Sequence, residues 1–191
     1  MPYTPPPELA SLSISEIAAM AEAQELPPVA QWSPTEEGDS EMRIAADGRW
    51  FHQGSIIPRP AMVRTFSTLL RREADASYAL VTPFQKLNII VDDAPFVAVE
   101  MENEGSGKAR KLAFRLNTDH LVVAGKNHPL RFPATKPQPY LTVRPGLEAV
   151  LARPVYYALA GMALAELDDA SDDAPFGLWS DGAFFPIEKP E

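Results

Sequence analysis

Asp92-Asp93-Ala94-Pro95-Phe96 recurs letter for letter as Asp172-Asp173-Ala174-Pro175-Phe176, so one pentapeptide occurs twice in this chain. Each copy combines turn-forming residues with an aromatic residue that opens an apolar stretch. A corner piece of this kind that is used twice predicts an internally duplicated fold.

A second pair of similar stretches flanks the first pair along the chain. Asp47-Gly48-Arg49-Trp50-Phe51 resembles Asp181-Gly182-Ala183-Phe184-Phe185, and both stretches have an Asp-Gly turn followed by aromatic residues. Asp-Gly suits the positive φ angles of a tight hairpin turn. The two echoes are spaced differently along the chain, so a simple tandem copy does not explain both. Duplication is therefore a hypothesis about architecture.

The chain before the first hairpin contains one predicted helix. Residues 1–12 are rich in proline and predicted to be extended. Ser13 and Glu16 form a capping box before apolar residues at helical spacing, which predicts a helix over 14–25. Residues 26–41 are predicted to be an acidic loop.

The middle of the chain has the pattern of strands around one helix. A hairpin is predicted at 42–45 and 49–52, and an amphipathic helix at 60–73, where Pro60 occupies a first helical position. Apolar stretches between turn signals predict strands at 78–82, 86–91 and 96–102.

The last part of the chain is predicted to be strand-rich. Pro145-Gly146 suits a type II turn between two strands, and a helix over 153–167, apolar on nearly every side, is expected to be buried. The predicted strands here are 108–116, 120–124, 128–132, 140–144, 147–151, 176–179 and 183–187.

Strands and helices in no regular βαβ alternation indicate an α+β fold. We expect an N-terminal helix and loop at 1–41, a first α+β unit at 42–103, and a second unit with a closing hairpin at 104–191. The helices 60–73 and 153–167 are expected to superpose with their neighbouring strands. Trp50 and Trp179 are predicted core residues, with a stacking platform for a base as the alternative.

Composition limits the class of protein. The chain has 191 residues, no cysteine and a net charge of −9, and we expect a soluble cytoplasmic protein without a signal peptide or membrane span. The charge is uneven, at −8 over residues 1–48, +6 over 49–165 and −7 over 166–191. The basic middle suits either an anionic small molecule such as a nucleotide or a surface that pairs with the acidic ends. Duplex nucleic acid is disfavoured, because no dense basic run is present.

The sequence does not fit the phosphate-binding loop pattern or the histidine spacing of a metal site. Gly105-Ser106-Gly107-Lys108 lacks the first glycine and the final hydroxyl residue of a phosphate-binding loop. His52, His120 and His128 have no spacing that places two metal ligands on one helix face. Neither a cofactor nor a metal is therefore predicted.

Many separate blocks of the sequence resemble the bacterial family called domain of unknown function 1285, over about residues 45–187. The blocks are Trp50-Phe51-x-x-Gly54-x-Ile56, Arg59 with Met62-Val63, Tyr78-x-Leu80-Val81-Thr82-Pro83, Asp92 to Phe96, Asn117-Thr118, His128-Pro129-Leu130, Pro139-Tyr140, Arg144-x-Gly146-Leu147-Glu148-Ala149, Arg153, and Trp179-Ser180-x-Gly182-x-Phe184-Phe185. The second Asp-Asp-Ala-Pro-Phe is not part of the family pattern.

This resemblance implies two similar α+β units, the second loosely like a pleckstrin-homology barrel. It also implies a groove between the units that holds a nucleotide-based ligand, a role in signal transduction, and no established activity. The leading hypothesis is therefore a non-enzymatic binding protein for a small molecule. The alternatives are a scaffold that contacts another protein and an enzyme that uses Asp92 or Asp93 as a base.

A candidate site follows from the arginines that stand next to turns and helix starts. Arg59, Arg144 and Arg153 would converge near the amino ends of two helices, where the dipole favours an anion. The alternative is that each arginine pairs with a nearby carboxylate such as Glu148 or Asp93. The full predicted ligand-binding set is Arg59, Asp92, Asp93, Asn117, Tyr140, Arg144, Glu148, Arg153 and Ser180.

Overall fold

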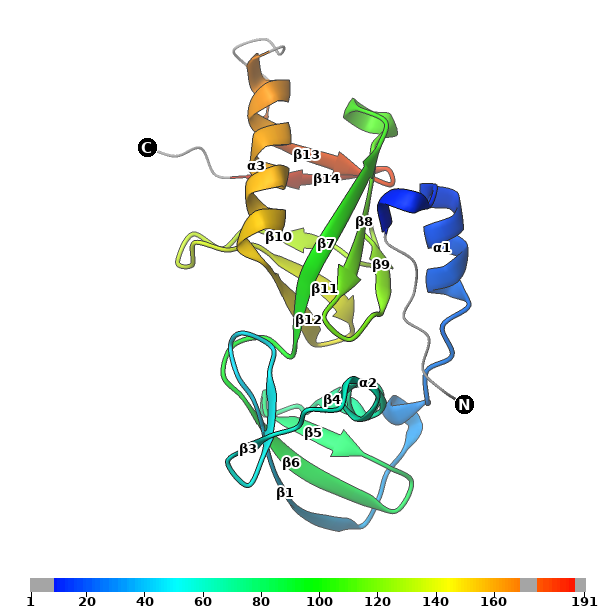
Figure 1. Cartoon of the computed structure of the whole chain (residues 1–191), viewed down its shortest axis with the longest axis vertical. Helices are drawn as coiled ribbons and strands as arrows, with labels where there is room; N and C mark the ends of the chain where they lie inside the picture. Colours follow the sequence, from blue (N-terminus) through cyan, green and yellow to red (C-terminus); the bar gives the residue numbers. More distant parts are fainter. Residues whose placement is uncertain (1–8, 169–174, 188–191) are drawn as a thin grey trace.

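Two six-stranded sheets lie one above the other along the long axis of the molecule (Figure 1), in a computed structural model that describes residues 9–168 and 175–187. The first sheet forms the lower unit. The second forms the upper unit and curls into a half-barrel. The fold is mixed α+β with three α-helices among the described residues, which confirms the predicted class.

The first unit contains six strands and one helix. They are β1 (Glu36–Ile44), β2 (Trp50–His52), β3 (Ser55–Ile56), α2 (Pro60–Thr68), β4 (Leu70–Arg72), β5 (Tyr78–Val81) and β6 (Gln85–Val91). The helix begins at Pro60, whose fixed φ and missing N–H suit a first helical position.

The second unit contains six further strands and the longest helix. They are β7 (Phe96–Glu104), β8 (Lys111–Leu116), β9 (Leu121–Val123), β10 (Leu130–Arg131), β11 (Tyr140–Arg144), β12 (Leu147–Leu151) and α3 (Arg153–Asp168). The hairpin of β13 (Gly177–Ser180) and β14 (Ala183–Pro186) follows, and α1 (Ile14–Glu22) precedes both units. Short 3-10 turns lie at Leu9–Ser11, Val29–Gln31 and Gly107–Ala109.

The two sheets have the same topology, which confirms the duplication. The first has the order β3-β2-β1-β6-β5-β4, and the second, read in the same sense, has β9-β8-β7-β12-β11-β10. In each unit, two three-stranded meanders meet in the middle, where the first strand runs parallel to the last. All other neighbouring strands in the two sheets are antiparallel.

Even single hydrogen bonds repeat between the units. The Asp92 N–H donates to the Ile44 carbonyl at 3.0 Å just after β6, and the Ala152 N–H donates to the Ala98 carbonyl at 3.0 Å just after β12. Both bonds continue the central parallel ladder by one residue beyond the last strand. Residues 92–95 therefore connect the units from the same position at which the second unit passes into α3.

The helices do not share this repeat, so the predicted superposition of 60–73 on 153–167 is wrong. In the first unit α2 connects the two meanders, whereas α3 follows the completed second sheet. The hairpins with Asp-Gly turns are not equivalent either, because β1 and β2 belong to the first sheet and β13 and β14 form a separate one. The second copy of the pentapeptide, residues 172–176, lies largely outside the described residues.

Several predicted segments differ from the structure, and one is the strand over 108–116, which begins at Lys111 after the 3-10 turn Gly107–Ala109. The acidic loop over 26–41 is wrong from Glu36 onward, because β1 pairs with both β2 and β6 despite its polar sequence. The helix over 60–73 ends at Thr68, because Leu70–Arg72 forms β4 against β5. The helix predicted over 14–25 likewise ends at Glu22.

The division expected at residue 103 does not follow the sheets. β7, expected in the first unit, pairs with β8 and β12 of the second. The sequence of β7 shows only that it is a strand, and the partners of a strand depend on tertiary contacts.

One apolar core runs through both units. Ile44, Trp50 and Leu70 of the first unit belong to the same buried cluster as Phe96 and Leu141 of the second. Trp50 is 1% exposed, which confirms its predicted core position. Trp179 is only partly buried, and its ring packs against Phe184 at 5.3 Å.

Candidate functional site

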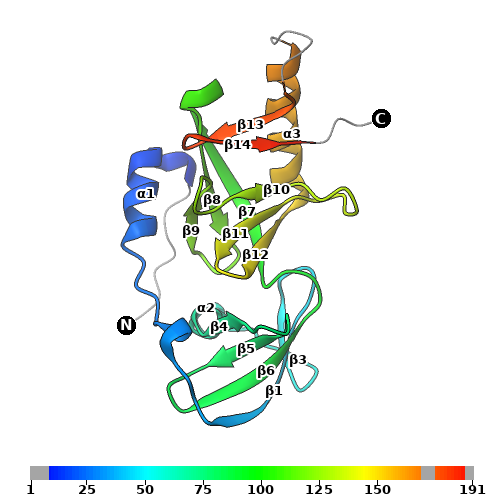
Figure 2. The ribbon, with the colours of Figure 1, turned by 180° about the vertical axis from the view of Figure 1, so that it is seen from behind.

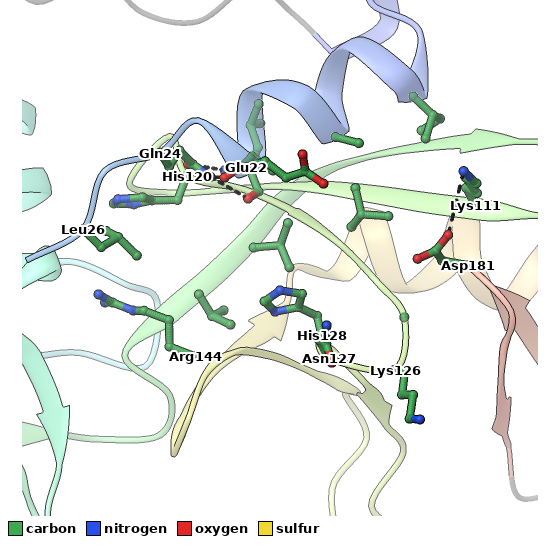
Figure 3. A pocket seen from close by; sticks show the side chains of 18 of the residues that line it. Glu22, Gln24, Leu26, Lys111, His120, Lys126, Asn127, His128, Arg144 and Asp181 are labelled. Atoms are coloured by element: carbon green, nitrogen blue, oxygen red, sulfur yellow. Dashed lines mark hydrogen bonds and ion pairs between the residues drawn. The ribbon is translucent and has the colours of Figure 1, made fainter. Parts of the chain in front are cut away.

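A groove of about 530 Å³ lies between α1 and the second sheet (Figure 3). Its walls come from α1 and the segment after it, from β9 and β11, and from the loop 124–129. None of the described residues that line it lies in the first sheet. The lining residues are Ile14, Ala18, Ala21, Glu22, Gln24, Leu26, Phe96, Lys111, His120, Leu121, Val122, Val123, Gly125, Lys126, Asn127, His128, Val143, Arg144 and Asp181.

The sequence of α1 explains how this wall is held in place. The capping box is present, since the Ser13 side chain accepts from the Glu16 N–H while the Glu16 carboxylate accepts from the Ser13 N–H. Ile14 and Ile17 are buried against Ala113 and Leu121 of the second sheet. The helix thus has one apolar face, and that face is on the sheet.

Gln24 anchors the carboxyl-terminal end of this wall. Its side-chain amide donates to the Leu121 carbonyl at 3.0 Å and accepts from the Leu121 N–H at 2.9 Å. A side chain therefore takes the place of a neighbouring strand along β9, which is the edge of the second sheet. Figure 3 shows these bonds beside His120, at the upper rim of the groove.

Arg144 supplies a buried positive charge on the opposite wall. Its guanidinium donates to the Ser67 carbonyl at 2.6 Å and to the Thr68 carbonyl at 3.3 Å. Both carbonyls belong to the last turn of α2, where a cation suits the helix dipole. Among the described residues no carboxylate forms an ion pair with it, and burial lowers the pKa of Arg144 to about 10.

His120 lies close to this charge and is neutral at pH 7. Its Nδ1 lies 2.9 Å from the Thr118 hydroxyl. Burial, together with the positive charges of Arg144 and Arg64, lowers the pKa of His120 from 6.5 to about 4. A positively charged ring would lose its hydration here and be repelled by both guanidiniums.

The outer part of the groove is more exposed and carries charges of both signs. Lys111 and Asp181 approach each other to 3.8 Å, and His128 Nδ1 donates to the Thr142 carbonyl at 3.2 Å. Lys126 lies on the loop below these residues in Figure 3. The described lining thus contains three basic side chains and two acidic ones, besides its histidines.

The three arginines predicted to converge do not meet at helix amino ends. Arg144 lies at the carboxyl end of α2, whereas Arg59 is the exposed residue that caps its amino end. Arg153 is the exposed first residue of α3. The prediction was wrong about the place of Arg144 because the direction in which a side chain leaves a turn depends on the packing of the two units.

Asp92 is held by an ion pair instead of facing a ligand. Arg43 donates to both of its carboxylate oxygens, at 2.9 and 2.5 Å. This hydrogen bonding lowers the pKa of Asp92. Glu148 is engaged in the same manner, because Arg131 donates to its two oxygens at 3.0 and 2.7 Å.

Asp93 and Tyr140 are two predicted site residues that the fold does bring together. The Tyr140 hydroxyl lies 2.9 and 2.8 Å from the two Asp93 oxygens, and the Lys136 ammonium contacts both side chains. Burial raises the pKa of Tyr140, and the hydrogen bonds raise that of Lys136. Arg131 covers the Tyr140 ring at 4.7 Å. This polar cluster joins residues 92–95, which connect the two units, to β11.

Asn117 and Ser180 have structural roles. The Asn117 side chain accepts from the Val97 N–H at 3.0 Å and donates to the Gly48 carbonyl at 3.2 Å, which ties the units together. The fully buried Ser180 hydroxyl accepts from the Leu112 N–H at 2.9 Å and donates to the Ala124 carbonyl at 2.7 Å. It fastens the closing hairpin to the second sheet.

A smaller cavity of about 180 Å³ lies between the units beside Asn117. Arg64 of α2 crosses it to Asp119, with a 2.6 Å ion pair, and also donates to the Thr118 carbonyl at 3.2 Å. This direct contact joins the two units across the cavity.

Several groove residues were missed by the sequence analysis. Gln24 and Lys126 stand in segments without a recognisable motif, and His120 was rejected as a metal ligand and not considered for a ligand site. The positive charge of the middle region was the one available signal, and it does not specify which cations share a cavity.

The fold and the groove define a class of protein: a duplicated α+β protein with a groove on its second unit, one wall of which holds the buried charge of Arg144. Residues 27–94 match the N-terminal domain, and residues 95–187 the C-terminal domain, of the proteins of unknown function called DUF1285. The chain belongs to this family. The boundary between the two matches falls where the chain passes from the first sheet to the second.

Two solved structures are similar to this chain. A DUF1285 family protein from Silicibacter pomeroyi DSS-3 is 46% identical, with 89% of this chain and 93% of that chain covered and a TM-score of 0.75. A DUF1285 family protein from Shewanella baltica OS155 is 25% identical, with 63% and 91% covered and a TM-score of 0.51. No protein with a curated description matches.

Within the described residues, no helix has the length and apolar character needed to cross a membrane.

Proposed function

We propose that this protein is a non-enzymatic binding protein for an anionic small molecule, held in the groove between α1 and the second sheet. The observation that carries the proposal is Arg144, a largely buried guanidinium on the groove wall without a carboxylate partner among the described residues. A buried charge is normally paired, because the loss of hydration is costly. The carbonyls of Ser67 and Thr68 offset part of this cost, and an anion would offset the rest.

The chemistry of the guanidinium favours a phosphate or carboxylate group. Arg144 has five N–H donors in a planar fork, and its two bonds to carbonyls leave further donors for planar, bidentate recognition. A groove of about 530 Å³ is within the usual range for small-molecule sites. Leu26, Val123 and Val143 offer apolar surface for the uncharged part of the ligand.

A nucleotide-based ligand fits this combination of charge and apolar surface, and a role in signal transduction would follow from ligand-dependent changes at α1. A cytoplasmic location belongs to the same proposal, since a chain without cysteine suits a reducing compartment.

Catalysis by Asp92 or Asp93 is disfavoured by the contacts and positions of these two carboxylates. Asp92 is paired with Arg43, and Asp93 is bonded to Tyr140 and Lys136. Neither residue lines the groove. A general base must reach the proton that it abstracts, so these two residues are poorly placed to act on a ligand there.

The test is a binding titration of inorganic phosphate and of nucleoside mono- and diphosphates, by calorimetry, with the parent protein and two variants. Arg144→Gln removes the charge, and its amide retains a donor for the Ser67 carbonyl. Arg153→Gln is the matched control, because Arg153 is exposed and outside the groove. A charged hydrogen bond contributes about 1.5–3 kcal/mol, so Arg144→Gln should weaken binding roughly 10- to 100-fold and the control should bind like the parent.

Two results would contradict the proposal. One is that no phosphorylated compound binds the folded parent protein. The other is that the Arg144→Gln variant, folded by circular dichroism, binds as tightly as the parent.

A scaffold that contacts another protein is the second candidate function. It is favoured by one observation outside the groove, the exposed apolar residues of α3, which include Tyr157 at 66% and Leu164 at 50% exposure.

A further inference from the structure

The outward side of α3 is apolar from end to end. The helix stands at the outer side of the second unit (Figures 1 and 2), with Val155, Leu159 and Ala163 buried in the core. Its exposed residues after Arg153, called here the outer face of α3, are Pro154, Tyr157, Ala158, Gly161, Leu164 and Ala165.

This face is unusual for a helix on a protein surface. Surface helices normally direct charged or polar residues away from the core. The expectation from sequence that this helix is buried was met on one side only, because the second sheet covers Val155, Leu159 and Ala163 and leaves the outer face open. Space is free above the centre of that face, since an added Cβ at Gly161 would meet no atom within 4 Å.

We infer that the outer face of α3 binds the same face of a second copy of this chain, with the two helices antiparallel and related by a two-fold axis at Gly161. The spacing of large and small residues carries this inference. About such an axis, Leu164 faces Ala158 of the second copy, and Tyr157 faces Ala165. Each large side chain therefore meets a small one, and the two glycines allow the backbones to approach closely.

The charges at the ends of α3 favour the same arrangement. Anions normally stabilise the amino end of a helix and cations the carboxyl end. In α3 the first turn contains Arg153 and no acidic residue, and the last turn contains no basic residue. Arg153 is therefore placed unfavourably for the dipole of its own helix, whereas Glu166 in the last turn is paired with Arg110 at 2.6 Å. An antiparallel second copy places the carboxyl end of one helix beside Arg153 and the amino end of the other, which offsets this repulsion.

A parallel arrangement would lose both advantages. It would place Tyr157 against Tyr157 and Leu164 against Leu164, and it would bring like charges and like dipole ends together. A two-fold contact is also the commonest way in which identical chains associate. A 16-residue helix is about 24 Å long, so the contact belongs with small interfaces, and we expect a dimer that dissociates on dilution.

The first test is sedimentation equilibrium over a range of concentrations. Leu164→Glu adds a charge to the centre of the contact at a residue that is 50% exposed, so the monomer fold should tolerate it. Phe84→Glu is the matched control, because Phe84 is 80% exposed and lies between β5 and β6 of the other unit. The parent and the control should dimerise, and Leu164→Glu should raise the dissociation constant at least 100-fold.

The second test fixes the axis. The chain has no cysteine, so a single introduced cysteine is the only thiol that can form a disulfide. Gly161→Cys should be oxidised to a covalent dimer, because its two sulfurs meet on the axis. Ala165→Cys should not, because the two copies of residue 165 lie about 12 Å apart along the helices. A parallel contact would cross-link both variants.

The inference is overturned if the parent stays monomeric at every concentration, or if Leu164→Glu dimerises like the parent. Equal cross-linking of the two cysteine variants would also overturn it. A monomeric parent whose Leu164→Glu variant loses thermal stability would show instead that part of the same chain covers the outer face.

Discussion

At the scale of single residues, His120 connects the groove to the pH dependence of folding. Its pKa is about 4 in the folded protein and 6.5 as an unperturbed side chain. Between these values the unfolded chain binds a proton that the folded protein does not. The contribution of neutral His120 to the stability of the folded protein is therefore fully present above pH 6.5 and is lost as the pH falls towards 4.

We predict that His120→Gln reduces the loss of stability between pH 6.5 and 4 by about 3 kcal/mol relative to the parent. Urea unfolding at several pH values measures this difference, and comparison with the parent cancels the titration of the carboxylates. If the free energy of unfolding depends on pH in the same way for the parent and His120→Gln, the pKa of His120 is not lowered in the folded protein.

The positions of core and turn residues were predicted better than the contacts of long charged side chains. The sequence was sufficient to place Trp50 in the core and Gly146 in a turn, where its φ is +75°. It was not sufficient to place Arg144, because an arginine beside a turn can face solvent, a carboxylate or, as here, the end of a helix in the other unit. Long side chains are positioned by contacts far away in sequence, and no local pattern records them.

At the scale of elements, the Gln24 side chain acts as a partner for the edge strand β9. We predict that Gln24→Ala destabilises the protein by about 1–3 kcal/mol, because it leaves the Leu121 N–H and carbonyl without their partner. Amide exchange should accelerate at Leu121 and along α1 more than in the first unit.

Gln31→Ala is a control, since Gln31 is an exposed glutamine in a neighbouring segment. Unchanged exchange at Leu121 in Gln24→Ala would show that water replaces the amide without loss. Helix α1 would then be held on the second sheet by the apolar contacts of Ile14 and Ile17 alone.

Elements with a clear local signal were predicted well. The capping box marked the start of α1, and Pro60 marked the start of α2. The first part of β1 was missed because Glu36–Ser40 has no apolar alternation, and its strand conformation comes from pairing with β6. The end of α2 was missed because the apolar Leu69 and Leu70 suit a helix and a strand equally.

At the scale of the whole molecule, the continuous core predicts that the two units unfold together. Asn117 tests this coupling, because its side chain bonds Val97 of one unit and Gly48 of the other. We predict that Asn117→Ala lowers the free energy of unfolding by about 1–3 kcal/mol while a single transition remains. Amide exchange in both sheets should accelerate by the same factor.

The matched control is Asn127→Ala, on the loop 124–129 of the second unit. Two separate transitions in the Asn117→Ala variant, with the first sheet exchanging before the second, would mean that the units are independent domains. The shared cluster of buried residues would then contribute little to cooperativity.

The duplication could be anticipated from the sequence, although not through the residues that suggested it. The Asp-Gly hairpins that prompted the idea are unrelated in space, whereas the true repeat is an order of strands. Such a repeat depends on which backbones pair, and dissimilar side chains can support the same pairing. The groove was less predictable, because α1 and the second sheet are far apart in sequence and meet through burial alone.

The parallel pair at the centre of each sheet has a consequence for biosynthesis. β1 pairs with β6, and β7 pairs with β12. The centre of each sheet can therefore form only after the last strand of that unit has been synthesised. On the ribosome, neither meander can complete its unit until that final strand has left the exit tunnel. Long-range pairing of this kind slows folding and exposes unpaired strand edges meanwhile. Since the two units also share one core, the nascent chain should resist protease only late, after β12 has emerged.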